Sequence, residues 1–122
     1  MSIETKEIGK EGERLALKYL EDNGFKIVAR NYRFGKGEID IIAEDTGDNF
    51  LVFVEVKTRL SPGYGAPEYA ITKQKIKQIK KVAELYLYEK KIREKDCRFD
   101  VIAIVLSNNE KPILTHYKNA FM

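Results

Sequence analysis

The sequence predicts an α/β fold in which a mixed β-sheet is flanked by helices. Hydrophobic patterning gives the order helix, three strands, helix, two strands. A strand, a long helix and another strand in succession favour a right-handed parallel crossover, so the sheet should contain both parallel and antiparallel neighbours. A chain of 122 residues that is 43% hydrophobic suits one compact domain, residues 1–122, with one core.

The first half of the chain reads as a helix followed by three strands. Apolar residues recur at helical spacing over residues 6–23, and Gly24 supplies a natural stop. Apolar segments bounded by turn residues then predict strands at residues 25–32, 37–44 and 50–57.

The second half reads as a loop, a helix and two strands. Two prolines and two glycines over residues 58–67 predict the loop, and an apolar stripe over residues 72–90 predicts the helix. A buried strand is expected at residues 99–106 and a short final strand at residues 113–117.

Two carboxylates, Asp40 and Glu55, interrupt otherwise apolar strand segments. Carboxylates seldom lie in a sheet interior without a partner. A hairpin loop of two residues (Gly47-Asp48) or four (46–49) sets Asp40 opposite Glu55, whereas a three-residue loop sets Asp40 opposite Val54. We favour the first register, which brings the two acids together.

Opposed like charges, with Cβ atoms roughly 4.5–5.5 Å apart, destabilise a sheet. A divalent cation removes this conflict, because two carboxylates, a backbone carbonyl and waters suit the octahedral oxygen coordination of Mg²⁺. Lys57 follows on the same face, opposite Glu38, and could contact an anion held by the metal. The alternative is a structural salt bridge in which Lys57 neutralises one acid and leaves the other unpaired.

The stretch "GEIDIIAED…FVEVKTR" resembles the Asp…Glu-x-Lys core of the PD-(D/E)xK nuclease superfamily, with Ile39 where the superfamily name has proline. The whole chain is similar to the small bacterial YraN-type proteins, which are themselves similar to archaeal Holliday-junction resolvases. This likeness extends through "GKEGERLALKYLEDNGFKIVARNYR", "KQKIKQIKKVAELYL", "RFDVIAIVL" and "HYKNAF". The resemblance implies a restriction-endonuclease-like fold, in agreement with the element order.

The resemblance also implies roles for five residues. Asp40, Glu55 and the carbonyl of Val56 would bind Mg²⁺ or Mn²⁺, and Glu13 on the first helix would complete the metal site. Lys57 would orient the attacking water or stabilise charge on the scissile phosphate. The implied reaction is in-line hydrolysis of a DNA phosphodiester without a covalent intermediate, with branched or junction DNA as a candidate substrate.

The charge distribution points to an anionic partner. Residues 1–70 hold ten Lys/Arg against thirteen Asp/Glu, whereas residues 71–98 hold ten against four. Lysines of the second helix could contact nucleic-acid phosphates, although a merely solvated helix face explains them equally well. The candidate nucleic-acid-binding residues, of which the resemblance supports the first, are Lys73, Lys77, Arg30, Arg33, Arg59 and Tyr64.

Other features limit the choice of function. No apolar run can span a bilayer, the polar N-terminal residues predict no signal peptide, and Cys97, the only cysteine, favours a reducing cytoplasm. Asp100 is expected to pair with Arg98 or a neighbour, and His116 is expected to be structural.

The sequence therefore predicts a cytoplasmic, metal-dependent endonuclease that acts on DNA and does not bind membranes. A non-cleaving nucleic-acid-binding module with the nuclease fold is the main alternative. A protein-interaction domain is a third, but it leaves the opposed acids unexplained. A second copy of the chain, in a homodimer, is a further candidate partner.

Overall fold

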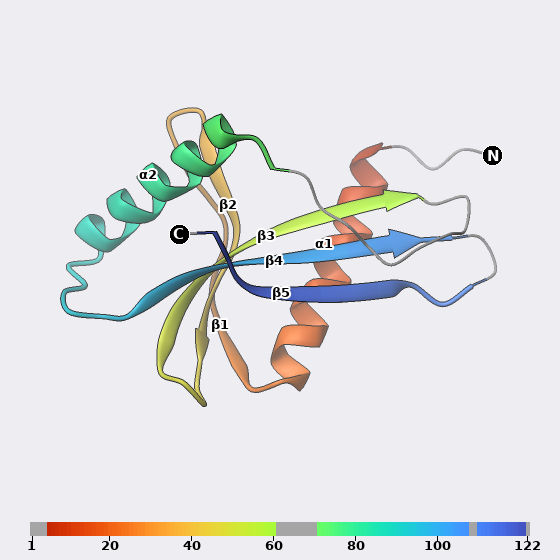
Figure 1. Ribbon diagram of the computed structural model, residues 1–122, viewed down its shortest axis with the longest axis horizontal. Helices are drawn as coiled ribbons and strands as arrows, with labels where there is room; N and C mark the ends of the chain where they lie inside the picture. Colours follow the sequence, from red (N-terminus) through yellow and green to blue (C-terminus); the bar gives the residue numbers. More distant parts are fainter. Residues whose placement is uncertain (1–4, 61–70, 108–109, 122) are drawn as a thin grey trace.

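Two helices pack against a five-stranded sheet in the computed structural model, which describes residues 5–60, 71–107 and 110–121 (Figure 1). The predicted order of elements is confirmed. The elements are α1 (Thr5–Asp22), β1 (Phe25–Phe34), β2 (Gly37–Asp45), β3 (Phe50–Leu60), α2 (Lys73–Glu89), β4 (Cys97–Leu106) and β5 (Ile113–Phe121).

The sheet is mixed, as predicted, and its strands lie side by side in sequence order. Neighbouring strands are antiparallel except β3 and β4, which are parallel and are connected through α2. Two parallel strands need a long crossover that returns the chain to the same end of the sheet, and α2 lies within that crossover. No helix in the part of the chain that the structure describes is long and apolar enough to cross a membrane.

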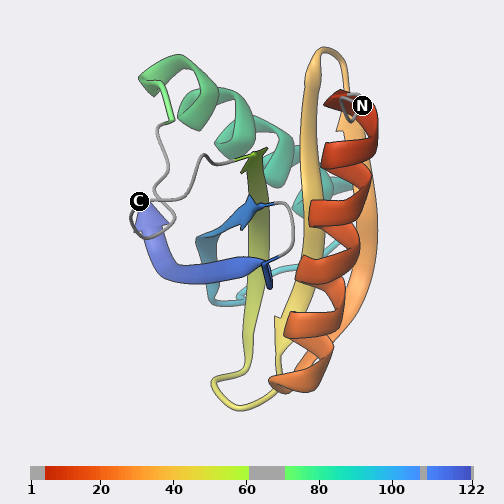
Figure 2. The same ribbon diagram turned by 90° about the vertical axis from the view of Figure 1, so that its right-hand side faces the viewer.

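The two helices cover opposite faces of the sheet (Figure 2). On one face, Ala16 and Leu20 of α1 pack against a cluster formed by Ile41, Ala43, Val52, Val54, Ile102 and Ile104. On the other face, α2 contributes Ile79, Val82, Ala83 and Tyr86 to a cluster with Ile39, Ile42, Leu51 and Phe53. Each fully buried large side chain stabilises the fold by about 1.5–3 kcal/mol, so these two layers fix both helices on the sheet.

Helix α1 approaches β3 closely at Gly12. A Cβ atom at this position would collide with the side chain of Thr58, so only glycine fits without displacing the helix or the threonine. This contact lies one residue from Glu13 and one residue from Lys57. It therefore fixes the backbone of α1 beside the part of β3 that carries the candidate lysine.

Several strands are longer than predicted. Strand β3 continues to Leu60, into the segment predicted to be a loop, because its parallel pairing with β4 extends to Leu60 and Leu106. Strand β4 begins at Cys97, and β5 extends to Phe121 through pairing with β4. Pairing partners that are remote in sequence thus override the local turn composition.

The β2–β3 hairpin has the favoured register, with pairs running from Asp45 and Phe50 to Ile41 and Val54. Its loop contains four residues, 46–49. The backbone N–H of Asn49 donates to the Asp45 carbonyl at 2.7 Å, and the Asp45 carboxylate accepts the Gly47 N–H at 3.1 Å. A carboxylate at the first position of the turn thus satisfies backbone groups of the loop and defines its length.

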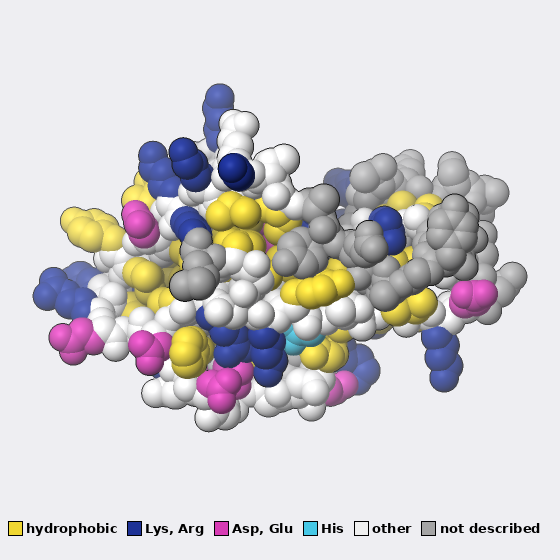
Figure 3. All heavy atoms as spheres, in the orientation of Figure 1, with side chains coloured by type: hydrophobic (Ala, Val, Ile, Leu, Met, Phe, Trp, Pro, Cys, Tyr) yellow, Lys and Arg dark blue, Asp and Glu magenta, His cyan; other side chains and the backbone are white. Residues whose placement is uncertain are grey.

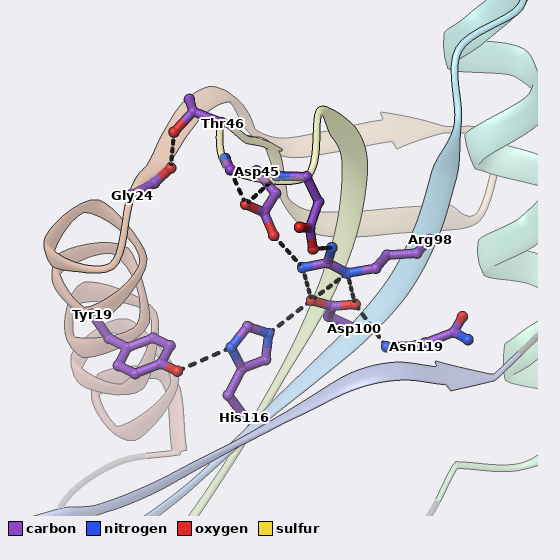
Figure 4. A network of polar contacts seen from close by, with 10 residues as sticks. Tyr19, Gly24, Asp45, Thr46, Arg98, Asp100, His116 and Asn119 are labelled. Atoms are coloured by element: carbon purple, nitrogen blue, oxygen red, sulfur yellow. Dashed lines mark hydrogen bonds and ion pairs between the residues drawn. The ribbon is translucent and has the colours of Figure 1, made fainter.

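A buried arginine connects this hairpin to β4 (Figure 4). Nη2 of Arg98 donates to Asp45 at 2.9 Å, and Nε donates to Asp100 at 3.0 Å. The Arg98 side chain is 7% exposed and the Asp100 side chain 0%. The predicted pairing of Asp100 with Arg98 is therefore confirmed.

Asp100 also receives hydrogen bonds from β5. Its carboxylate lies 2.7 Å from Nε2 of His116 and accepts the Asn119 N–H at 3.0 Å. Nδ1 of His116 lies 3.0 Å from the Tyr19 hydroxyl of α1, which gives the histidine the structural role expected of it. Burial opposes the charge of Asp100, but the hydrogen bonds from His116, Arg98 and Asn119 outweigh it and hold the pKa of this carboxyl below its ordinary value.

We predict that Arg98→Met destabilises the protein by about 3–5 kcal/mol, because it leaves two buried carboxylates without their cation. Chemical denaturation measures this change. Arg14→Met is the control: Arg14 pairs with Glu11 on an exposed surface of α1, and its loss should change stability by less than about 1 kcal/mol. Equal effects of the two variants would contradict an anchoring role for Arg98.

Candidate functional site

The β2–β3 pairing ends one residue before the two acids. The last pair is Ile41 with Val54, and beyond it Oδ2 of Asp40 accepts a hydrogen bond from the Val56 N–H at 2.8 Å. The Asp40 side chain thus accepts a backbone hydrogen bond from β3 that a backbone carbonyl of β2 would accept in a regular ladder. The strand ends separate here, and the carboxyl groups of Asp40 and Glu55 lie close enough to interact directly.

Glu55 has the least favourable environment of the candidate residues. Its side chain is 10% exposed, and among the described residues Oε2 has no hydrogen-bond partner. Burial raises the pKa of Glu55 to about 8, and both the charge of Asp40 and a hydrogen bond between the two carboxyl groups contribute to the increase. The positive charges of Lys75 and Lys57 partly oppose it. At neutral pH the folded chain therefore keeps a proton on Glu55, whereas a free glutamate is already ionised.

Lys75 of α2 was missed by the sequence analysis. Its Nζ lies 3.9 Å from Oε2 of Glu55, whereas Lys57 is exposed to solvent. A signal was available: Lys75 lies four residues before the buried Ile79, so it continues the stripe of α2 that faces the sheet.

An open pocket of about 880 Å³ surrounds the acids. It lies between the N-terminal half of α1, the adjacent ends of β1, β2 and β3, and Lys75 of α2. Seven residues proposed from the sequence line it, namely Glu13, Arg33, Asp40, Glu55, Val56, Lys57 and Arg59. Lys6 and Lys10 of α1 line it as well, so the pocket combines three acids on strands, Glu38, Asp40 and Glu55, with several cations.

Glu13 lines this pocket but is held by β1. Its Oε1 accepts a hydrogen bond from Nδ2 of Asn31 at 3.1 Å and lies 3.4 Å from Nη2 of Arg30. Asn31 has a φ of 49°, a left-handed conformation that asparagine tolerates better than most residues. No group of three His, Cys, Asp or Glu side chains close enough to hold a metal ion occurs within residues 5–60, 71–107 and 110–121. The structure therefore brings Asp40 and Glu55 together without Glu13.

Glu38 also lines the pocket, whereas Lys73 and Lys77 are not among its lining residues. Glu38, predicted opposite Lys57, instead forms an ion pair with Arg33 at 3.6 Å, because β2 remains paired with β1 after it has separated from β3. Lys73 and Lys77 are exposed on α2, where Figure 3 shows Lys and Arg side chains gathered. Tyr64 lies outside the described residues.

The donor set fits a hard divalent cation. A buried carboxylate oxygen without a hydrogen bond, beside a second carboxylate, is the kind of oxygen-rich environment that Mg²⁺ prefers. Two acids in contact also disfavour full ionisation in the absence of a cation. Asp40, Glu55 and the Val56 carbonyl are the groups that would hold it.

The model of the family described as "Uncharacterised protein family UPF0102" matches residues 12–104. A UPF0102 protein of Persephonella marina is 48% identical over 113 residues, which cover 93% of this chain and 91% of the relative. One of Geobacter metallireducens is 46% identical over 121 residues, 99% of this chain and 97% of the relative. One of Dictyoglomus thermophilum is 45% identical over 120 residues, 98% of this chain and 100% of the relative.

The raised pKa of Glu55 predicts a pH dependence of folding in metal-free buffer. The unfolded chain loses this proton near pH 4.5 and the folded chain near pH 8, so between these values the folded state binds more protons. Stability should therefore fall as the pH rises from about 4.5 to about 8. The loss is on the order of a few kcal/mol, since one pKa unit corresponds to about 1.4 kcal/mol.

Urea denaturation of wild type and Glu55→Gln across this range tests the prediction. The glutamine variant should lose the dependence and exceed the wild type in stability at pH 8. Glu84→Gln, at an exposed position of α2, is the control and should retain the wild-type profile. Parallel profiles for wild type and Glu55→Gln would contradict the assignment.

Proposed function

The chain belongs to the protein family UPF0102, and from the geometry of its site we propose that it is a metal-dependent endonuclease that hydrolyses DNA phosphodiesters. The observation that supports this proposal most is the buried Oε2 of Glu55, which lies next to Asp40 and has no hydrogen bond among the described residues. Such a pair is destabilising in a protein that only needs to fold, and a divalent cation would make it favourable.

We propose Mg²⁺ or Mn²⁺ as the cofactor, held by Asp40, Glu55 and the Val56 carbonyl. When bound, the cation would supply Lewis-acid chemistry to a phosphate oxygen and to the attacking water. The Asp40 carboxylate would also keep its hydrogen bond to the Val56 N–H, which holds the carboxylate at the margin of β3. The protein's part is to fix these oxygens at one end of the sheet before substrate arrives.

Lys57 is the proposed catalytic cation. It is exposed, lines the pocket, and follows Val56 directly on β3. Its ammonium group would orient the attacking water or stabilise the charge that develops on the phosphate, so its effect belongs to the transition state. Glu13 would join this chemistry through Oε2, since Arg30 and Asn31 both contact its Oε1.

The proposed partner is DNA, bound mainly through its phosphates. Arg33 and Arg59 line the pocket together with Lys6 and Lys10, and the exposed Lys73 and Lys77 would extend the contact along α2. Such contacts position a nucleic acid without reading its sequence. Branched or junction DNA is the substrate class that the resemblance to resolvases favours.

A non-cleaving nucleic-acid-binding module is the second candidate. The observation in its favour is that Glu13 is held by Arg30 and Asn31, so the pocket brings only two acids into contact. The intact set of Asp40, Glu55 and Lys57 favours the enzyme. Cleavage assays distinguish the two candidates.

We expect Mg²⁺ or Mn²⁺ to raise the melting temperature of the wild type by several degrees at saturating concentration, because the cation binds only the folded state. Asp40→Asn should abolish the shift and should melt higher than the wild type without metal, since it removes a like charge beside Glu55. Differential scanning calorimetry with and without EDTA measures both effects. Asp22→Asn, on the exposed surface of α1, should keep the wild-type shift. Absence of any shift in the wild type would exclude a functional cation site.

The activity itself is tested with labelled duplex, flap and four-way-junction DNA in the presence of Mg²⁺ or Mn²⁺. Lys57→Ala should lower the cleavage rate by about 10²–10³-fold while it reduces DNA affinity only modestly, because one phosphate contact among many is lost. Lys57→Arg should restore little activity, since the planar guanidinium is larger and does not share its proton.

Asp40→Asn serves as the inactive control and monitors contaminating nuclease. Equal cleavage by the wild type, Lys57→Ala and Asp40→Asn would attribute the activity to a contaminant. A pure wild type that binds every substrate and cleaves none would favour the binding module.

A further inference from the structure

Lys75 differs from the other lysines of α2 because it is directed toward the acids. Its Nζ lies 3.9 Å from Oε2 of Glu55, and its side chain is 38% exposed, compared with 10% for Glu55. The distance corresponds to an ion pair but not to a hydrogen bond. Oε2 therefore has a neutralising charge nearby and still has its lone pairs available.

The start of α2 determines this position. Thr72 caps the helix by accepting the Lys75 N–H at 3.1 Å, and Ile79, one turn further along, is buried in the core. Side chains four residues apart lie on one face of a helix, so the buried isoleucine directs Lys75 toward the sheet. Lys73 and Lys77, each two positions away, are exposed.

Local electrostatics oppose a lysine at this position. The N-terminus of a helix carries partial positive charge, and the first turn of α2 contains no acidic residue to offset it. Glu55 is the acid that the structure places opposite this charge. The interaction is thus specified across the fold, between a strand and a helix, and not within the helix.

We propose that Lys75 is a positioning cation that exchanges partners: it stays beside Glu55 while the site holds no divalent cation, and it turns to a DNA phosphate when a divalent cation binds Glu55. This inference rests on the proposed function of the same site. Lys75 lines the pocket and is partly exposed, so its long side chain has room to move. A lysine and a divalent cation beside one carboxylate oxygen repel each other, which supplies the driving force.

The exchange has a thermodynamic signature. Lys75 competes with the metal for Glu55, so in the absence of DNA it weakens metal binding. Without metal, Lys75 is occupied by Glu55 and adds little to DNA affinity. With metal, it becomes available for a phosphate, so metal and DNA should each strengthen the binding of the other by the same factor.

The test compares wild type with Lys75→Met, which removes the charge and keeps most of the side-chain length. Lys81→Met, at an exposed position of the same helix, removes the same charge away from Glu55. Isothermal titration calorimetry with Mg²⁺ alone gives the metal affinity. Fluorescence anisotropy of a short labelled duplex, with and without Mg²⁺, gives the DNA affinity, and a denaturing gel shows that the duplex stays intact. Lys75→Gln repeats each measurement with a polar side chain.

We expect Lys75→Met to bind Mg²⁺ about two- to fivefold more tightly than the wild type, as a partly exposed ion pair suggests. Its metal-free DNA affinity should be unchanged, and it should lose much of the gain in DNA affinity that Mg²⁺ gives the wild type. Lys81→Met should keep the wild-type metal affinity and the wild-type gain.

Three results would overturn the inference. A DNA affinity that falls equally with and without Mg²⁺ would make Lys75 an ordinary phosphate contact. Unchanged metal affinity together with an unchanged gain in Lys75→Met would make it a bystander. If the wild type itself binds no Mg²⁺, the metal site of the proposed function fails and this inference fails with it, whereas the first two results leave the proposed function standing.

Discussion

The position of the candidate site depends on the hydrogen bonds of one buried guanidinium. Arg98 joins Asp45, at the turn of the β2–β3 hairpin, to Asp100 in β4. Asp45 in turn accepts backbone groups of the hairpin loop and so defines its four-residue length. Because one residue more or less would reverse the faces of a strand, this anchored turn fixes which side chains of β2 and β3 meet at the opposite end.

At that opposite end of the hairpin the regular pairing of β2 with β3 stops. The ladder between β2 and β3 stops at Ile41 and Val54, and Asp40 takes the next backbone N–H of β3 with its side chain. The exchange brings Asp40 and Glu55 into contact in a partly buried place, where burial and the charge of Asp40 raise the pKa of Glu55. One end of the hairpin is thus stabilised by the hydrogen bonds of Asp45, and the other end is destabilised by the contact of two acids. We expect this combination where a protein loses some stability for the sake of function.

Most of the fold followed from the sequence, because it depends on patterns that are local or nearly local. Element order, the parallel crossover and the hairpin register follow from apolar periodicity and turn residues, and all agree with the structure. Strand ends were less predictable: β3 extends to Leu60 because β4 pairs with it from a remote part of the sequence. The pairing of Glu38 was wrong for a related reason, since strand separation depends on side-chain chemistry that a register count ignores.

The site was predictable only in part. Two acids inside apolar strands were a clear signal, because burial of opposed carboxylates demands an explanation. The contact of Lys75 with Glu55 was not deduced, since it requires the position of α2 over the sheet. The hydrogen bond from Asn31 to Glu13 accompanies a left-handed backbone conformation of Asn31 within β1, for which the sequence contains no turn signal.

The close approach of Gly12 to Thr58 has a consequence for how this site tolerates change. The helix that carries Glu13 packs at Gly12 against the Thr58 side chain of the strand that carries Lys57, and the missing Cβ of the glycine leaves room for that threonine. Substitutions elsewhere in α1 or β3 should therefore change the width of the pocket only slightly as long as Gly12 and Thr58 stay in contact. Any larger residue at position 12 would therefore push α1 away from β3 or displace Thr58, and would change the distance between Glu13 and Lys57.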